Sequence, residues 1–364
     1  MKHSRFPSFS PKTSSGKTYI VPVFIPHAGC PHCCTFCNQQ IITGSSPNLP
    51  ASDKIVSHIQ TFLDYRSAPA SRIQISFYGG NFLGMETEEM LRLLRIGRQF
   101  IREGKVQSLR FSTRPDTITP HTLSLIQSFP VSTVEIGAQS MDDRVLRFSR
   151  RGHSAADTEN AVRMLRAEDY EIGLQMMPGL PGESPDSSRE SGRRIAALSP
   201  DFVRIYPTVV LKNSLLAKWY REGKYSPLSL AEAVERSKEL YCMFRERQIP
   251  VIRMGLQASE DLSTDAAVLA GPWHPAFGFL VRSQIYLEKA LHLISSLSSD
   301  DTDWKNKEIC LRVHPRRISE MRGLKNRNTG IIRGKYSPRS LRILGDQNTA
   351  DGEIRLHFEE LPEG

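Results

Sequence analysis

The chain has 364 residues, 39% of them hydrophobic, so it is long enough to bury one large core and a smaller one. No apolar run reaches the ~20 residues that a membrane span needs. Residues 1–18 lack the apolar stretch of a secretory signal, so a membrane or exported protein is not expected, and we predict a disordered tail there. The net charge of +9 is compatible with a polyanionic partner.

Strand-like and helix-like stretches alternate over residues 19–258. Runs of β-branched and aromatic residues predict strands at 19–24, 72–78, 106–112, 133–137, 171–177 and 201–206, with a short one at 251–253. Helical spacing predicts helices capped by Asp53, Thr119 and Ser154, and further helices at 87–103, 185–198 and 230–246. Such alternation indicates a parallel sheet. We therefore expect an α/β fold, an incomplete (β/α)6-type TIM barrel.

Residues 259–364 are expected to form a smaller α/β domain, with a helix near 283–297 and a strongly basic segment. Between residues 312 and 342 the only acidic residue is Glu320. A solvated basic face and a polyanion site both remain open. Tyr336 is the one aromatic residue there, which gives little support for base stacking. The basic residues are Arg312, Arg316, Arg317, Arg322, Lys325, Arg327, Arg333, Lys335, Arg339 and Arg342.

Cysteines cluster directly after the first predicted strand. Cys30, Cys34 and Cys37 follow a C-x3-C-x2-C spacing, and thiolate is the ligand that iron–sulfur clusters use. Three thiolates leave one iron of a four-iron cluster open to bind a small molecule. Cys33 would give a fourth ligand for zinc, but its side chain diverges from that of Cys34, and structural zinc sites space their ligand pairs further apart. We interpret Cys33 as a non-ligand and, since cluster thiolates need a reducing compartment, expect a cytoplasmic protein.

Polar or glycine-rich groups also follow the other predicted strands, where barrel enzymes place their functional groups. Two adjacent glycines after the second strand let backbone approach a ligand closely, although an ordinary turn would look the same. Arg151 could grip a carboxylate in bidentate fashion, or could be a surface arginine. The candidates are Gly79, Gly80, Asn81, Thr113, Gln139, Arg151 and Gln175.

Together these motifs resemble the radical S-adenosylmethionine (SAM) superfamily. The stretches 134–140, 150–153 and 174–182 look like the elongator catalytic subunit with its short bacterial relatives, and like oxygen-independent coproporphyrinogen oxidase. The stretches 77–82, 114–116, 204–207 and 253–257 lean toward the elongator-like branch.

The resemblance implies a role for each matching position. Cys30, Cys34 and Cys37 would ligate a [4Fe-4S] cluster, and the remaining candidates would contact SAM. Phe36 would lie against the adenine, Gly79, Gly80 and Asn81 at the methionine amino group, Thr113 by the methionyl end, Gln139 and Gln175 by the ribose, and Arg151 by the carboxylate.

The sequence also departs from these relatives. A carboxylate or threonine is common where Asn81 stands, an acid is common at Gln175 in the porphyrinogen oxidases, and Gln39 replaces a further cysteine of their motif. The final hundred residues show no acetyl-coenzyme A loop, so carboxymethylation of wobble uridine by this chain alone is not expected.

The sequence thus predicts a radical SAM enzyme that takes an electron from flavodoxin or ferredoxin and cleaves SAM to a 5′-deoxyadenosyl radical. The basic segment 312–342 and the elongator-like motifs favour an RNA substrate. A small anionic metabolite or tetrapyrrole is the alternative substrate, and a non-catalytic iron–sulfur protein that binds RNA or senses redox state is the alternative class. Catalytic side chains are not identified; Tyr206, His274 and Glu135 are candidates by position only.

Overall fold

A computed structural model of the chain describes residues 18–25, 28–31, 34–38, 49–66, 72–256, 267–296 and 307–360, with 358–360 as backbone only. Cys33 and residues 1–17 of the predicted tail lie outside this range. The chain divides into two compact units, residues 1–275 and 276–364. The boundary predicted at residue 258 stays a prediction. In the described parts, every helix is too short or too polar to cross a membrane.

The first unit is built on a seven-stranded sheet in the order β1-β2-β3-β4-β5-β6-β8, and every neighbouring pair is parallel. The predicted α/β partial barrel is therefore confirmed, with the short strand near residue 251 as its seventh strand. The strands are β1 (Thr18–Phe24), β2 (Arg72–Tyr78), β3 (Ser108–Thr113), β4 (Val131–Gln139), β5 (Glu171–Met176), β6 (Phe202–Ile205) and β8 (Val251–Met254).

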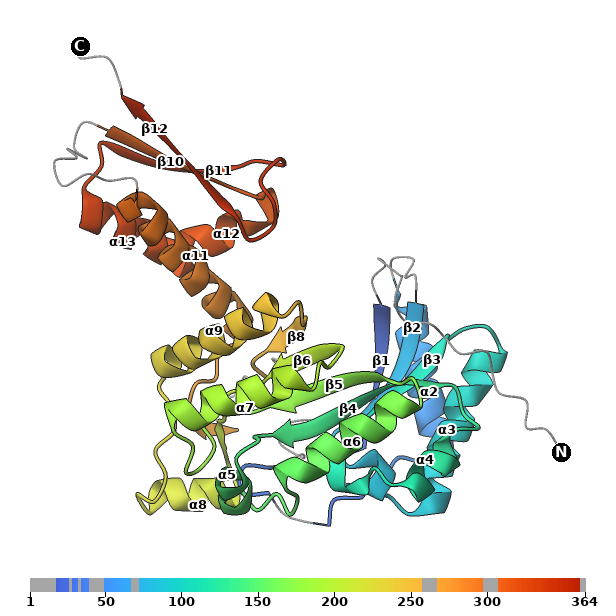
Figure 1. Cartoon of the computed structure of the whole chain (residues 1–364). Helices are drawn as coiled ribbons and strands as arrows, with labels where there is room; N and C mark the ends of the chain where they lie inside the picture. Colours follow the sequence, from blue (N-terminus) through green and yellow to red (C-terminus); the bar gives the residue numbers. More distant parts are fainter. Residues whose placement is uncertain are drawn as a thin grey trace. The chain divides into compact units, whose positions relative to one another are not determined.

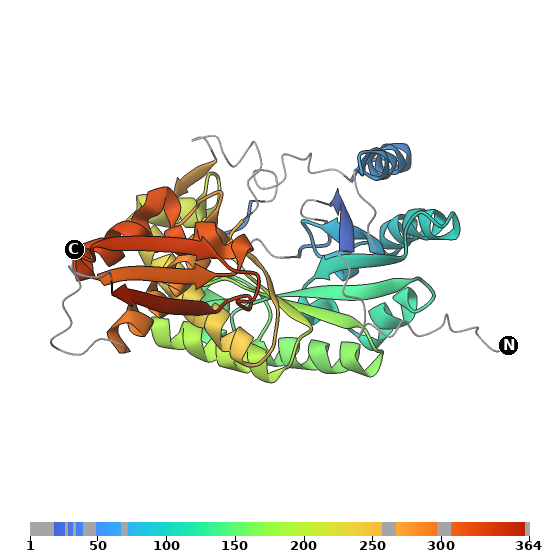
Figure 2. The ribbon, with the colours of Figure 1, turned by 90° about the horizontal axis from the view of Figure 1, so that it is seen from above.

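Helices cover the outer side of this curved sheet (Figures 1 and 2). The longer ones are α2 (Ser52–Asp64), α3 (Thr87–Arg102), α6 (Ala155–Ala167), α7 (Pro185–Ala197) and α9 (Leu230–Glu246). Three short ones are α4 (Pro120–Ile126), α5 (Asp143–Phe148) and α8 (Leu215–Arg221), and a small antiparallel pair joins β7 (Val210–Leu211) to β9 (Val268–Ala270). The short elements α5, α8, β7 and β9 were not predicted from sequence.

Capping explains where several helices begin. Thr119 and Ser154 each cap a helix through a capping box, as predicted, and Pro120 occupies the first turn where its missing N–H costs nothing. The predicted cap at Asp53 is wrong. The N-cap is Ala51, two residues earlier, so helix α2 begins at Ser52. Asp53 lies in the first turn, where its carboxylate interacts favourably with the positive end of the helix dipole.

The two faces of the sheet differ in chemistry. On β3, Leu109 packs so tightly against α3 that a Cβ at Gly97 would come within 2.5 Å of it, so Leu109 faces the helices. Because side chains alternate along a strand, Arg110 faces the opposite, inner side. Polar side chains bond one another there: the Gln74 amide donates to Ser108 and Thr133 at 3.0 and 3.1 Å. The inner face is therefore polar, and suits a site rather than a packed core.

The second unit is a small α/β domain, as predicted. Its three-stranded sheet has the order β11-β10-β12, parallel on one side and antiparallel on the other. Apolar side chains of the sheet pack against helix side chains around buried Ile309, Leu311 and Met321. The elements are α11 (Phe277–Ser296), β10 (Lys307–Val313), α12 (Ile318–Arg322), α13 (Arg327–Tyr336), β11 (Ser340–Gly345) and β12 (Ile354–Glu360).

Candidate functional site

The cysteine loop follows β1 and is tied to distant parts of the first unit. Thr35 is fully buried. Its backbone N–H donates to the carbonyl of Ser149 at 3.1 Å, and its carbonyl accepts from the N–H of Leu216 at 2.7 Å. Asn38 donates its side-chain amide to the carbonyl of Lys212 at 2.9 Å. These anchors lie at the end of α5, directly after β7 and at the start of α8. The loop is therefore held at the carboxyl end of the sheet on both sides of Cys37.

The loop after β2 meets the cysteine loop backbone to backbone. A Cβ at Gly80 would lie 2.6 Å from the carbonyls of Ile25 and Ala28, and one at Gly29, where φ is +69°, would lie 2.2 Å from the carbonyl of Asn81. Only glycine allows such an approach. The two loops are joined by hydrogen bonds, since the Asn81 N–H donates to Ala28 at 2.8 Å.

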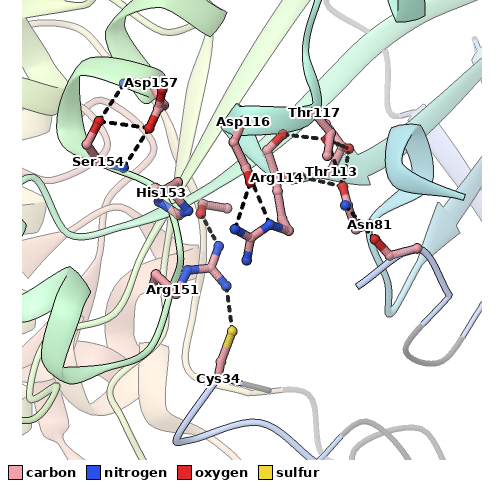
Figure 3. Close-up of polar contacts among 12 residues, drawn as sticks. Cys34, Asn81, Thr113, Arg114, Asp116, Thr117, Arg151, His153, Ser154 and Asp157 are labelled. Atoms are coloured by element: carbon pink, nitrogen blue, oxygen red, sulfur yellow. Dashed lines mark hydrogen bonds and ion pairs between the residues drawn. The ribbon is translucent and has the colours of Figure 1, made fainter. Parts of the chain in front are cut away.

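Asn81 is buried and connects three strand ends (Figure 3). Its amide nitrogen donates to the carbonyl of Gly29 at 2.7 Å. Its amide oxygen accepts from the hydroxyls of Thr113 and Thr117, at 2.7 and 2.9 Å, and from the N–H of Arg114 at 3.0 Å. The side chain is therefore committed to fixing the loops. The predicted contacts of Asn81 and Thr113 with SAM stay predictions.

Arg151 brings a positive charge to the cysteine loop. One guanidinium nitrogen donates to Cys34 Sγ at 3.1 Å, and another donates to the carbonyl of Gly137 at 2.6 Å (Figure 3). The side chain is buried, and its Nε finds no partner among the described residues. Arg151 therefore links the cysteine loop to the end of β4.

Two neighbours of Arg151 complete this part of the site. Gln139, the last residue of β4, has φ of +66°, a backbone conformation that residues other than glycine rarely adopt. Its buried amide oxygen has no hydrogen-bond partner within the described residues. Buried His153 contacts the carbonyl of Ala138 at 3.3 Å. Burial, aided by the cations Arg151 and Arg114, lowers the pKa of His153 to about 3, so its ring is neutral.

The other predicted site residues occupy distinct places. Phe36 packs beside the apolar cluster of Val210 and Leu216. Gln175 is half-buried near the end of β5, and its side chain forms no hydrogen bond in the described part of the chain. Gly79 has φ of +92° directly after β2, which glycine alone adopts readily. The structure thus puts all these residues at the carboxyl ends of the strands, and their contacts with SAM stay predictions.

A charged cluster lies deeper on the inner face. The carboxylate of Glu135 accepts from Arg110 Nε at 2.6 Å, pairs with Arg204 Nε at 2.6 Å, and accepts from the Tyr78 hydroxyl at 3.1 Å. Arg204 also donates to the Tyr206 hydroxyl at 3.1 Å. Desolvation disfavours the Glu135 anion, but the two guanidiniums outweigh it and hold the Glu135 pKa below its usual range. Two cations around one anion leave this cluster with a net positive charge.

Sequence reasoning named Glu135 and Tyr206 by position but missed Arg110 and the loop anchors Thr35 and Asn38. The alternation of polar residues on β3 was a usable signal for Arg110, whereas nothing local indicates the anchors. His274, also named by position, lies in the turn after β9.

The donor set fits an iron–sulfur cluster. Cys30, Cys34 and Cys37 lie on one short loop, and none of them is fully buried. The described residues include no group of three His, Cys, Asp or Glu side chains already placed around a metal position, so the fit rests on thiol chemistry and spacing. The unpartnered polar atoms of Gln139 and Arg151 fit a polar ligand at the same edge, such as the amino acid and ribose parts of SAM.

Similar proteins were found both among curated sequences and among solved structures. The chain is 26% identical over 248 residues to the tRNA uridine(34) acetyltransferase of Dehalococcoides mccartyi, covering 59% of this chain and 54% of that protein. It is 24% identical over 270 residues to an uncharacterized protein of Methanocaldococcus jannaschii, covering 71% and 80%. The solved archaeal Elp3 of Methanocaldococcus infernus shares the fold, with a TM-score of 0.58 and 21% identity over 75% of this chain and 63% of that one.

The chain spans about half the length of the tRNA uridine(34) acetyltransferases that it matches first. Two family models match successive parts of the chain. The Radical SAM superfamily model matches residues 24–194, which contain the cysteine loop and strands β2 to β5. The Radical_SAM C-terminal domain model matches residues 200–287. The chain is therefore an enzyme that belongs to the radical SAM superfamily.

Proposed function

We propose that this enzyme holds a [4Fe-4S] cluster through Cys30, Cys34 and Cys37 and binds SAM at the neighbouring strand ends. When bound, the cluster would supply the electron for cleavage of SAM into methionine and a 5′-deoxyadenosyl radical, and this radical would take a hydrogen atom from the substrate. The observation that carries the proposal is the Arg151 guanidinium, which reaches Cys34 on one side and the end of β4 on the other.

The protein's own residues hold the two partners in place. Arg151 offers its charge both to the thiolate and, through its unpartnered Nε, to a carboxylate. Gln139 presents an amide oxygen that accepts no hydrogen bond from any described residue, which suits ribose hydroxyls. Asn81 fixes the glycine loop, so that the backbone of Gly79 and Gly80 can meet an amino group. Phe36 and Gln175 complete the proposed SAM site.

We propose RNA as the substrate. The relatives' names concern tRNA, and the second unit exposes eight basic side chains between residues 316 and 342: Arg316, Arg322, Lys325, Arg327, Arg333, Lys335, Arg339 and Arg342. Phosphate contacts from a subset of these side chains would position an RNA without reading its sequence. The proposed setting is cytoplasmic, with flavodoxin or ferredoxin as electron donor.

A small anionic metabolite is the second candidate substrate. The observation that favours it is the cluster of Arg110 and Arg204 around Glu135, a net cation on the inner face of the sheet. A carboxylate or phosphate of a small substrate would be attracted there.

Iron analysis after anaerobic reconstitution tests the cluster. We expect about four irons per chain, and loss of the cluster in Cys30→Ala, Cys34→Ala and Cys37→Ala. Cys33→Ala and the distant Cys242→Ala serve as controls and should keep it. Zinc in place of iron, together with a need for Cys33, would contradict the proposal.

Anaerobic crosslinking in cells, followed by sequencing of bound RNA, tests the substrate class. Enrichment of a specific RNA supports the RNA proposal, and its absence favours the metabolite. Intact SAM after reduction of protein with full iron content would instead point to a non-catalytic cluster protein.

A further inference from the structure

The second unit holds a pocket that the proposed SAM chemistry does not use. It lies between the end of α12, the first turns of α13 and the edge strand β11, elements that Figure 1 labels. Its volume of about 440 Å³ falls within the ~300–1,000 Å³ of ordinary small-ligand sites. The lining residues are Arg322, Asn326, Thr329, Arg333, Leu341, Arg342, Ile343 and Leu344.

The pocket is strongly positive. Three guanidiniums line it, from Arg322, Arg333 and Arg342, and no acidic residue does. Arg342 is paired with Glu308 at 3.1 Å. Arg322 and Arg333 are exposed, and their side chains have no hydrogen bond or ion pair in the described part of the chain. Two guanidiniums therefore remain available to an anion.

One arginine of the basic segment, Arg317, is already committed to carboxylates. Arg317 pairs with Glu320 at 3.1 Å and with Asp351 at 2.6 Å. Arg282 also pairs with Glu320, at 2.5 Å. The basic segment is thus not one uniform cationic face.

The wall between α12 and α13 has a fixed shape. Buried Asn328 donates its amide to the carbonyls of Ser283 and Glu320, at 2.9 and 3.3 Å. Just before it, Lys325 and Asn326 both have φ near the left-handed region, at +51° and +60°. Such conformations persist only where the surroundings impose them, and they cluster at binding sites.

The rest of the lining suits a sugar or a base. Leu341 and Ile343 belong to the core of the unit and offer it an apolar surface. The Thr329 hydroxyl is buried and has no hydrogen-bond partner among the described residues. Arginine pairs with phosphate through its planar fork and also stacks on bases, so a nucleotide can be held without an aromatic ring.

We propose that this pocket binds a phosphodiester segment of single-stranded RNA. Phosphates would lie at Arg322 and Arg333, and a ribose or base would lie on Leu341 and Ile343. The inference rests on the proposed RNA substrate and names where that substrate docks. It separates two docking arginines from the other exposed arginines of the segment.

Salt-dependent binding of labelled bulk tRNA to the reconstituted full-length chain tests the proposal. The pocket variant is Arg322→Gln with Arg333→Gln. The matched control is Arg316→Gln with Arg339→Gln, which removes two exposed arginines of the same segment outside the pocket. The pocket variant should weaken binding at least tenfold and reduce the log–log salt slope by roughly 1.4–1.8, about 0.7–0.9 for each lost phosphate contact. The control should change affinity less than about twofold.

A second variant distinguishes the loss of specific contacts from misfolding of the first variant. Arg322→Lys with Arg333→Lys keeps both charges but loses the planar fork, so the salt slope should stay near wild type while the affinity falls. Equal losses in the pocket and control variants, or no loss in either, would overturn the inference. Tight binding of uridine monophosphate, with unchanged tRNA affinity in the pocket variant, would assign the pocket to a free nucleotide instead. Formation of 5′-deoxyadenosine without RNA reports separately on the proposed chemistry, so failure of one is not failure of the other.

Discussion

Replacing Glu135 by glutamine should destabilise the first unit more than the loss of an ion pair on the surface does. The carboxylate is only 2% exposed and holds Arg110 and Arg204 at 2.6 Å each. Glutamine keeps the shape but leaves two cations inside the sheet without an anion. Breaking a buried pair by removing one partner costs roughly 3–5 kcal/mol. For a unit of this size that corresponds to a fall in Tm of roughly 6–20 °C.

Calorimetry and urea unfolding of the full chain measure this loss. The matched control is Glu190→Gln, because Glu190 pairs with Arg193 at 2.9 Å on the surface, with both side chains 57% exposed. That change should cost less than about 1 kcal/mol. Adding Arg204→Met to Glu135→Gln removes one stranded cation and should recover part of the loss. Equal stabilities of the Glu135 and Glu190 variants would refute the reasoning.

The same cluster predicts a pH dependence. The folded pKa of Glu135 lies below its ordinary value, so the folded state keeps the anion where the unfolded chain takes up a proton. The stabilisation is therefore present above about pH 4.5 and is lost as the pH falls through the folded pKa. Glu135→Gln should show a weaker loss of stability with acid than wild type, and an unchanged acid slope would contradict the assignment.

Two further changes test the upper part of the site. Arg151→Gln should lower SAM affinity about ten- to a hundredfold in equilibrium dialysis with little change in iron content, because a charge-assisted hydrogen bond contributes roughly 1.5–3 kcal/mol. The control is Arg150→Gln at the exposed neighbouring residue. Equal SAM affinities of the two variants would exclude this role for Arg151. His153 should stay neutral, with its NMR signal flat from pH 8 to 5, since its pKa is about 3. Its neutral ring stabilises the fold above pH 6.5, and that stabilisation is lost as the pH falls toward 3. A histidine NMR signal that titrates with a midpoint near pH 6.5 in wild type and is absent from the His153→Gln spectrum would contradict this.

The sequence predicted the sheet well because its signals are local. Alternating apolar residues mark each strand, and glycine or proline ends it. Thr119 and Ser154 were recognisable as caps from neighbouring residues, such as Pro120 directly after Thr119, and both caps bond to a residue three positions on. The failure at Asp53 has the same local origin, since Ser52 and Asp53 both suit a helix start, and the structure places the cap at Ala51.

The contacts that build the site join residues far apart in the chain. Arg151 and Cys34 are separated by 117 positions, and Asn81 and Gly29 by 52. No periodicity indicates such pairs. The same holds for the basic segment, whose charge is evident from the sequence, whereas the pairing of Arg317 with Asp351, 34 positions on, is not. Which arginines remain available is therefore a property of the fold.

The most direct test of the account is the fate of SAM. Anaerobically reconstituted protein, reduced with dithionite, is incubated with SAM, and 5′-deoxyadenosine is measured for wild type and for Cys34→Ala. We expect 5′-deoxyadenosine from wild type even without substrate, and none above background from Cys34→Ala. Intact SAM after prolonged incubation with wild-type protein of full iron content would contradict the central claim.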